Sequence, residues 1–273
     1  LVMIRFGDLK KQETFFKQKN ILTGQAAAER LRVERLQRSQ QILSKDTQQI
    51  RFRDFVKEAW FILEPTTKCV WNWHIDAICD HLEAVLRGEI RNLLINIPPR
   101  HTKSLTVSVC WPAHTWTDLP AFRFLSGAYA QHLSIRDALK SRRLIESSWY
   151  QEQWGVRFQL TSDQNQKMRY ENDKTGHRIT TYVGGSTGEG GDCLLLDDPH
   201  NIEEKDSEII RQGVLDWYDQ VWINRLNDPK TGRKVTIMQR VHEKDLAGHI
   251  LEAGSCVHLS LPVEFERDRK CMT

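Results

Sequence analysis

The sequence of 273 residues is long enough for one large α/β core with helical additions. Hydrophobic residues make up 40% of the chain and charged residues 27%, which fits a soluble globular protein. No apolar run reaches the roughly 18 to 20 residues that a membrane span requires, and no secretory signal follows Leu1. The six cysteines lack paired spacing, which predicts reduced thiols. The composition therefore predicts a cytosolic protein that does not cross a membrane.

The net charge of +3 is unevenly distributed along the chain. Residues 1–59 contain 13 Lys/Arg against 7 Asp/Glu, whereas the remainder contains 26 against 29. From Asp8 to about Lys57 the sequence is polar, lacks proline and places apolar residues loosely at helical spacing. We interpret residues 1–59 as a basic α-helical N-terminal arm. Such an arm contacts DNA phosphates or an acidic partner, or it is a solvated helical face.

A second unit is expected to begin near Trp60, and Glu64 to Thr67 breaks the helix before a new one runs from Asn72 to Arg87. After Gly88, short apolar runs alternate with helical stretches, which predicts an α/β fold with a mostly parallel sheet. The expected strands are Asn92–Ile97, Phe122–Gly127, Val156–Leu160, Ile179–Val183, Cys193–Leu196, Lys234–Met238 and Val257–Leu261. The expected helices are Lys103–Trp116, Gln131–Glu146, Ser207–Trp222 and Lys244–Ala253. Two segments suit tight turns, Asn172–Gly176 and Asp228–Gly232.

A loop between the first of these strands and the helix after it has the context of a phosphate-binding loop. Backbone N–H groups and the helix dipole favour phosphate at such a helix start. Lys103 is expected to reach the β- and γ-phosphates of ATP, and the Ser104 hydroxyl to bind Mg²⁺. The expected ATP-binding residues are Pro99, Arg100, His101, Thr102, Lys103, Ser104 and, packed near the adenine, Trp73.

The match to the phosphate-loop pattern G-x-x-x-x-G-K-[ST] is incomplete, because Ile97 and Thr102 occupy the two glycine positions. An ordinary strand-to-helix turn is therefore an alternative for this segment. If the residue before Lys103 requires a positive φ, the β-branched Thr102 carries strain on the order of 1 to 2 kcal/mol. Weaker nucleotide binding would follow.

An acidic strand end forms the second signal, where Cys193–Leu196 runs into Asp197 and Asp198. Four apolar residues before a carboxylate describe a buried strand that delivers an acid to the ligand-binding edge of the sheet. Asp197 is expected to hold Mg²⁺, and Glu203 and Glu204 to orient the attacking water. A solvated loop start is the alternative for an acidic strand end taken by itself.

Three segments in this order resemble successive motifs of the large subunit of tailed-phage terminases. They are Pro98–Ser104, Leu195–His200 and Ile237–Gly248, and the resemblance extends over about Trp60 to Glu264. It implies a RecA-like P-loop NTPase of the additional-strand, catalytic-glutamate (ASCE) class, with a mostly parallel central sheet flanked by helices. In this family the motor domain pumps DNA into a procapsid and is followed by a nuclease domain.

The resemblance also assigns roles to individual residues. Lys103 and Ser104 match the phosphate-loop pair, Arg100 the basic residue of the terminase loop, and Asp197 the acidic strand end. The catalytic glutamate is best matched by Glu203, with Asp198 and Glu204 as competitors. The coupling motif, which responds to loss of the γ-phosphate, is matched by Gln239 and Arg240.

Two positions depart from the family pattern. The family has glycine where Thr102 stands, and relatives carry an arginine where this chain has Glu189. That arginine reaches the phosphates of the neighbouring subunit, and such a finger contributes on the order of 10³ to 10⁵ in rate. Another arginine supplies this charge, with Arg142, Arg143 and Arg225 as candidates, or the chain hydrolyses ATP poorly.

The sequence thus predicts an ATP-hydrolysing motor domain of a terminase large subunit, over residues 60–265, that translocates double-stranded DNA. The implied partners are double-stranded DNA, the portal and procapsid, the small terminase subunit and further copies in a ring, with a monomer as the alternative in isolation. The expected location is the host cytoplasm. Residues 266–273 are expected to start a linker to a nuclease domain outside this sequence, so no DNA cleavage is expected. The alternatives are a helicase or recombination ATPase, and a nucleotide-binding assembly scaffold with little turnover.

Overall fold

The computed structural model describes residues 50–161, 166–185 and 188–263. They belong to a compact unit that starts at Ile50. Residues 1–49 of the arm predicted for residues 1–59 lie outside the described residues. Helix α2 (Phe52–Leu63) crosses the boundary predicted at residues 59 and 60. Its Phe52, Phe55 and Ala59 are fully buried in the main core. That boundary is therefore placed too late, because the apolar face of α2 is part of the same core.

The helix predicted for Asn72–Arg87 is confirmed as α3 (Trp73–Leu86), with Asn72 as its N-cap. The Asn72 side chain accepts a hydrogen bond from the backbone N–H of Trp73 at 2.8 Å, which satisfies one of the free donors of the first turn. Glu83 on this helix accepts a 2.7 Å hydrogen bond from the N–H of Phe52 and thereby also caps α2.

The strands of the described residues form one sheet in the order β3-β4-β2-β5-β6-β1-β7. Their bounds are β1 (Asn92–Asn96), β2 (Phe124–Ala128), β3 (Arg169–Glu171), β4 (His177–Tyr182), β5 (Cys193–Asp197), β6 (Arg233–Met238) and β7 (Val257–Ser260). All neighbouring pairs are parallel except β3 with β4. The mostly parallel sheet that the alternating pattern predicts is confirmed.

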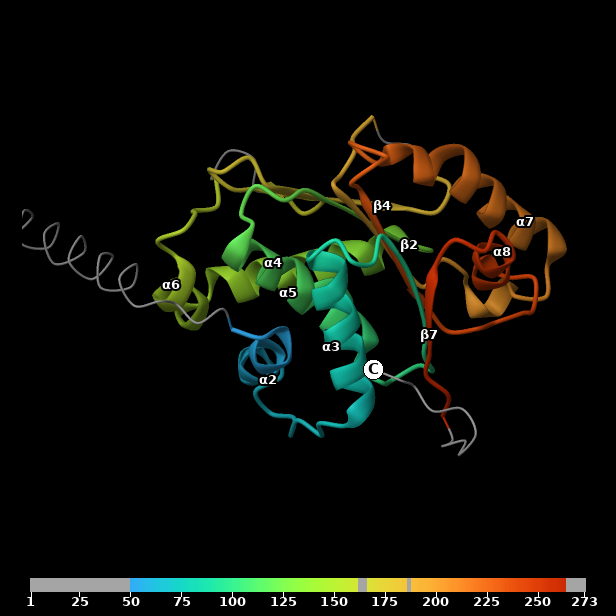
Figure 1. The fold of residues 1–273 in the computed structure, drawn as a ribbon. Helices are drawn as coiled ribbons and strands as arrows, with labels where there is room; N and C mark the ends of the chain where they lie inside the picture. The colour runs from blue at the N-terminus through green and yellow to red at the C-terminus, as the bar shows by residue number, and fades with distance from the viewer. Residues whose placement is uncertain (1–49, 162–165, 186–187, 264–273) are drawn as a thin grey trace, which may run out of the picture. The chain divides into compact units, whose positions relative to one another are not determined.

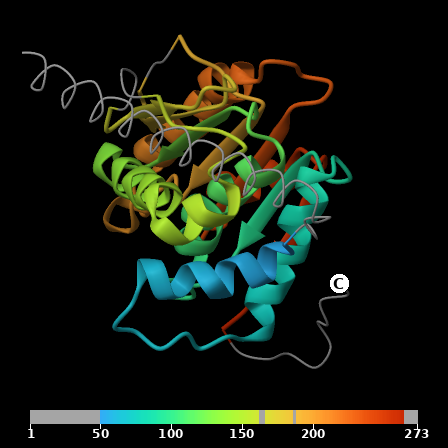
Figure 2. The ribbon, with the colours of Figure 1, turned by 90° about the vertical axis from the view of Figure 1, so that its left-hand side faces the viewer.

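Helices cover both faces of this sheet (Figures 1 and 2). On one face lie α2, α3, α4 (Trp111–Asp118), α5 (Gln131–Glu146) and α6 (Ser148–Trp154). On the other lie α7 (Glu208–Trp217) and α8 (Leu246–Glu252). Two separate hydrophobic clusters fill the two interfaces, with Leu93 and Leu195 on the first and Leu94 and Leu196 on the second. The alternation of neighbouring residues explains why these strands are apolar throughout.

Two details of the predicted elements are wrong. Val156–Leu160 is not a strand, since only Leu160 forms an isolated bridge, to Asn172. The strand at this edge of the sheet is β3, which pairs antiparallel with β4, and its three residues Arg-Tyr-Glu are too short and too polar to show a strand pattern. The turn Asn172–Gly176 between β3 and β4 is confirmed, with the Asn172 side chain accepting from the N–H groups of Lys174 and Gly176.

The helix after the phosphate loop is also less regular than predicted. The π-helix η1 (Leu105–Cys110) precedes α4 within the range predicted as one helix, Lys103–Trp116. Pro112 lacks the N–H that an α-helix would direct to Ser108, so the ordinary hydrogen-bond ladder cannot continue through this point. The predicted helix Ser207–Trp222 likewise divides into α7 and the π-helix η3 (Tyr218–Trp222).

One strand, β6, separates β1 from β5 in the sheet. The carboxyl ends of β1, β6 and β5 therefore lie side by side, and each leads directly into one of the three sequence motifs. This is the additional strand of the fold class that the resemblance implies. None of the helices in residues 50–161, 166–185 and 188–263 is long and apolar enough to cross a membrane.

Candidate nucleotide-binding site

The loop after β1 departs from ordinary backbone geometry at two residues. Arg100 has a φ of 66° and Thr102 a φ of 60°, and helical structure begins at Lys103. The positive φ considered for Thr102 from the sequence is therefore present. A β-branched residue in this left-handed region is strained by about 1 to 2 kcal/mol. The loop thus keeps the backbone shape of a glycine-containing turn without the glycine.

Replacing Thr102 by glycine is expected to stabilise the folded chain. Glycine adopts this φ without strain but loses more backbone entropy on folding, so we expect a net gain of about 0.5 to 1 kcal/mol in the free energy of unfolding. Thr102→Ala retains Cβ and is expected to change the free energy less. Urea denaturation of the three proteins measures the order, and a glycine variant less stable than the wild type contradicts the strain.

Lys103 and Asp198 form an ion pair at the centre of the site. The Lys103 side chain is only 8% exposed, so its charge is held inside the protein by this carboxylate. The other oxygen of Asp198, Oδ1, accepts a hydrogen bond from the backbone N–H of Gln239 at 3.2 Å. Asp198 itself has a φ of 43°, which turns the chain sharply after β5. One carboxylate therefore connects the phosphate loop, the acidic strand end and the Gln239 segment.

Asp197 is buried beside this pair, with a relative exposure of 6%. Its Oδ2 accepts a 2.7 Å hydrogen bond from the Ser108 hydroxyl, and the nearby Ser104 side chain acts to lower the pKa of the carboxyl group. Burial, followed by repulsion from Asp198, raises the pKa of Asp197 to about 6, although Lys103 opposes the rise. The protein's own cations and hydrogen-bond donors therefore do not fully offset the cost of burying the ionised Asp197 carboxylate.

The surroundings of Asp197 fit a bound Mg²⁺. Its Oδ1 is buried and has no hydrogen-bond partner, which leaves an uncompensated acceptor next to a serine hydroxyl. Mg²⁺ prefers carboxylate and hydroxyl oxygens, and it commonly keeps several waters when it binds substrate phosphates. Ser104 and Asp197, the two residues expected from the sequence, are therefore brought together.

The raised pKa of Asp197 predicts how stability depends on pH without metal. Because the folded-state pKa of about 6 exceeds the ordinary 3.8, the folded chain binds the proton more tightly than the unfolded chain between these values. The free energy of unfolding therefore falls as pH rises through this window. Asp197→Asn is expected to remove this dependence and, at about pH 8 in EDTA, to be more stable by on the order of 1 to 3 kcal/mol. Urea unfolding of both proteins at about pH 4 and pH 8 measures the two free energies of unfolding. If the stability difference between variant and wild type is the same at both pH values, the raised pKa of Asp197 is contradicted.

Glu203 and Glu204, predicted to orient water, lie on the short 3₁₀-helix η2 (Ile202–Glu204) after β5. Both side chains are exposed. The carboxylate that contacts Lys103 is Asp198, the competitor in the sequence analysis. The structure therefore brings Asp198 to the centre of the site and leaves Glu203 and Glu204 at the surface.

Trp73 lies at the start of α3 and is 48% exposed. Its ring contacts His74, whose ring lies 5.5 Å from that of His101 in the phosphate loop. Burial, together with repulsion from His101, lowers the pKa of His74, so the His74 imidazole favours the neutral form. The start of α3 is thus adjacent to the loop, as a role for Trp73 beside a nucleotide base requires.

The Gln239–Gly248 segment is organised by Asp245, which is fully buried. Its carboxylate accepts hydrogen bonds from Arg240 Nε at 3.1 Å and from the N–H groups of Val241, His242 and Gly248 at 3.0 to 3.3 Å. Asp245 is thereby the N-cap of α8 and the anchor of the predicted coupling residue Arg240. A second link joins this segment to β5, since His200 Nε2 accepts from the N–H of Leu246 at 2.9 Å.

Asp245→Ala is expected to destabilise the protein by about 2 to 4 kcal/mol. The variant loses a helix cap and leaves the Arg240 charge and two loop N–H groups without their buried acceptor. Urea denaturation measures the loss, with Glu252→Ala on the exposed end of α8 as the matched control, expected within about 0.5 kcal/mol of the wild type. Equal stability of the two variants would remove the anchoring role.

Glu189, which stands where the resemblance implies an arginine, pairs with Arg169 at 2.5 Å. Arg169 also pairs with Glu171 on the same strand. Of the three alternative arginines, Arg142 lies within 3.7 Å of Glu146 on α5, and Arg225 lies before β6 at the amino edge of the sheet. The assignment of a finger arginine therefore stays a prediction.

Three residues of the site received no role from the sequence. Ser108 lies within a helix of apolar residues and bonds to Asp197, while His200 and Asp245 stand inside the terminase-like motifs and bridge them. For His200 and Asp245, the only signal in the sequence was their position inside the motifs. The sequence around Ser108 contained no signal, because the contact of Ser108 with Asp197 depends on the π-helical backbone of η1.

The sheet order, the loop after β1, the acidic end of β5 and the additional strand β6 define a P-loop NTPase fold. Comparison with solved structures gives the same result. The chain is similar to the large terminase of bacteriophage HK97, with a TM-score of 0.50 and 13% identity over 82% of this chain and 45% of that protein. The fold expected from the resemblance to terminases is thus confirmed.

Two further solved structures are more distantly similar. One is a large terminase of a thermophilic bacteriophage in complex with ADP, with a TM-score of 0.42 and 9% identity over 66% of this chain and 44% of that one. The other is the ATPase domain of the Thermus phage P74-26 large terminase, with a TM-score of 0.39 and 11% identity over 66% of this chain and 69% of that one. No protein-family model matches the sequence, and a search of curated proteins finds no match. The chain spans less than half the length of the HK97 protein.

Proposed function

We propose that this chain is the ATP-hydrolysing motor domain of a phage terminase large subunit that translocates double-stranded DNA into a procapsid. The observation that carries the proposal is the meeting of Lys103, Ser104, Asp197, Asp198 and Gln239 at the carboxyl ends of three adjacent strands. These residues come from three motifs that are about 90 and 40 residues apart in the sequence. Phosphoryl transfer requires a cation that binds phosphate, a carboxylate that binds metal and a second carboxylate.

Lys103 and Asp198 perform the central steps in this proposal. When ATP binds, the ammonium of Lys103 leaves Asp198 and contacts the β- and γ-phosphates. There it neutralises the negative charge that develops during the reaction. Asp198 is then free to accept a hydrogen bond from the attacking water. Ser104 and Asp197 would hold Mg²⁺, which would supply further positive charge to the phosphates. Because Asp198 also bonds to the N–H of Gln239, a change in its partners reaches the segment anchored by Asp245.

The proposed partners follow from the same assignment. They are double-stranded DNA, the portal and procapsid, the small terminase subunit and further copies of the chain in a ring, in the cytoplasm of the host. The test is phosphate release from ATP with Mg²⁺, with and without double-stranded DNA, together with ATP-dependent DNA packaging into procapsids. DNA-stimulated turnover and procapsid-dependent packaging are expected, and packaging without a requirement for procapsid portals contradicts the terminase assignment.

A nucleotide-binding scaffold with little turnover is the second candidate. Two observations favour it, the strained Thr102 in the loop and the pairing of Glu189 with Arg169 in place of a finger arginine. Equilibrium binding of fluorescent ADP together with turnover separates the two functions. Binding without turnover, in the presence of DNA and neighbouring subunits, supports the scaffold.

A further inference from the structure

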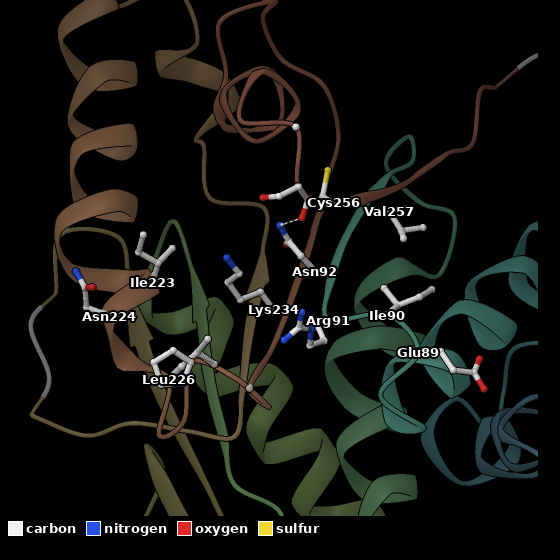
Figure 3. Close-up of a pocket in the computed structure, with 14 residues that line it drawn as sticks. Glu89, Ile90, Arg91, Asn92, Ile223, Asn224, Leu226, Lys234, Cys256 and Val257 are labelled. Carbon is white, nitrogen blue, oxygen red and sulfur yellow. Dashed lines mark hydrogen bonds between the residues drawn. The ribbon is translucent and has the colours of Figure 1, made fainter.

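A cavity of about 700 Å³ lies at the amino ends of β1, β6 and β7 (Figure 3). Asn92, the first residue of β1, lines it, whereas the phosphate loop follows the last residue of the same strand. Five residues of extended chain, about 16 Å, therefore separate this cavity from the nucleotide site. Its volume falls within the range of roughly 300 to 1,000 Å³ in which small molecules bind.

Two basic side chains, Lys234 and Arg91, line this cavity together (Figure 3). The sheet fixes their spacing, because the backbone N–H of Lys234 donates to the carbonyl of Arg91 at 2.7 Å. Lys234 is partly buried, and this burial lowers its pKa, so the charged ammonium lacks full solvation. In the described part of the chain neither residue forms an ion pair.

The single carboxylate among the lining residues does not neutralise these charges. Glu89 is held by the guanidinium of Arg87 through two hydrogen bonds of 2.7 and 2.9 Å. Arg91 uses one nitrogen, Nη1, to donate to the carbonyl of Lys230 at 2.6 Å, which leaves its other donors for a ligand. The cavity therefore holds two positive charges whose counter-charge the described residues do not supply.

Apolar side chains form part of the remaining walls. Ile223 and Leu226 come from the segment before β6, and Ile90 and Val257 from the starts of β1 and β7. Asn92 Nδ2 donates to the carbonyl of Ser255 at 2.9 Å, which ties the β1 side of the cavity to the β7 side. A ligand with an anionic group and an apolar body would contact both the basic and the apolar side chains of this cavity.

We propose that this cavity binds an organic phosphate monoester, with the phosphate on Lys234 and Arg91 and the apolar body against Ile223 and Leu226. A phosphate monoester carries about −1.5 to −2 charges at pH 7, which matches two cations better than a single carboxylate does. The planar guanidinium of Arg91 suits phosphate oxygens, and the Lys234 ammonium adds a point charge. This site is separate from the phosphate loop and independent of the proposed motor function.

Phenyl phosphate is the probe for this site, titrated into the full chain by calorimetry. We expect saturable binding that is at least tenfold weaker in Lys234→Met and in Arg91→Met. The matched control is Lys174→Met, which removes one charge from another turn at the same edge of the sheet, where Lys174 pairs with Asp173 at 3.1 Å. We expect the control to bind as the wild type does. Absence of saturable binding, or equal binding by all four proteins, overturns the proposal.

Two comparisons locate the ligand without relying on the stability of these variants. Phenyl phosphate is expected to protect Lys234 of the wild type from acylation, measured by mass spectrometry, and to bind more tightly than inorganic phosphate or phenol. Lys103→Ala is expected to retain phenyl phosphate binding, and ADP is not expected to displace it. Displacement by ADP places the probe at the phosphate loop and overturns the proposal, whereas loss of ATP binding alone contradicts only the motor function.

Discussion

Replacing Lys103 by alanine is expected to lower the rate of ATP hydrolysis on the order of 10³-fold. The Lys103 ammonium is the cation of the phosphate loop, and it already lies in a buried position against Asp198. Steady-state phosphate release at saturating Mg²⁺ and ATP measures the change.

The matched control for this variant is Lys140→Ala on α5, where the ammonium is 37% exposed and pairs with Glu64 at 2.8 Å. We expect it to hydrolyse ATP within about twofold of the wild type, because exposed ion pairs contribute little. Thermal unfolding of both variants shows whether the fold is retained. Equal turnover by the wild type and folded Lys103→Ala would falsify the motor function for this chain.

Asp198→Asn is expected to reduce turnover on the order of 10² to 10³-fold while nucleotide binding is retained. Asparagine keeps an oxygen that accepts from the N–H of Gln239, but it cannot take a proton from water or hold Lys103 as an ion pair. Binding of fluorescent ADP is therefore expected to be at least as tight as in the wild type, since Lys103 is released for the phosphates. Single-turnover hydrolysis and equilibrium binding measure the two effects.

The comparison variants for Asp198 are Glu203→Gln and Glu204→Gln. Both side chains are exposed on η2, so we expect each variant to change turnover less than about threefold. A large loss in Glu203→Gln together with a small one in Asp198→Asn contradicts the assignment of Asp198. That outcome restores Glu203 as the catalytic carboxylate predicted from the resemblance and requires η2 to move when nucleotide binds.

Elements with strong local signals were predictable from the sequence. The helix Gln131–Glu146 matches α5 at both ends, and the apolar strands β1, β5 and β6 differ from their predicted bounds by one residue. The short polar strand β3 was not predictable, because its pairing with β4 follows from the turn between them rather than from its own residues. The π-helix η1 was also not predictable, since the spacing of apolar residues in the sequence does not distinguish it from an α-helix.

The sequence by itself determined the P-loop class of fold and the residue types of the site. The phosphate-binding lysine, the serine and the acidic strand end each belong to a local sequence motif. Only the tertiary structure decided which carboxylate lies against Lys103. Asp198 is placed there by the strand order, which sets β5 next to β6 and β6 next to β1, together with its own left-handed backbone turn. Strand order arises from non-local pairing, and no single segment of the chain encodes it.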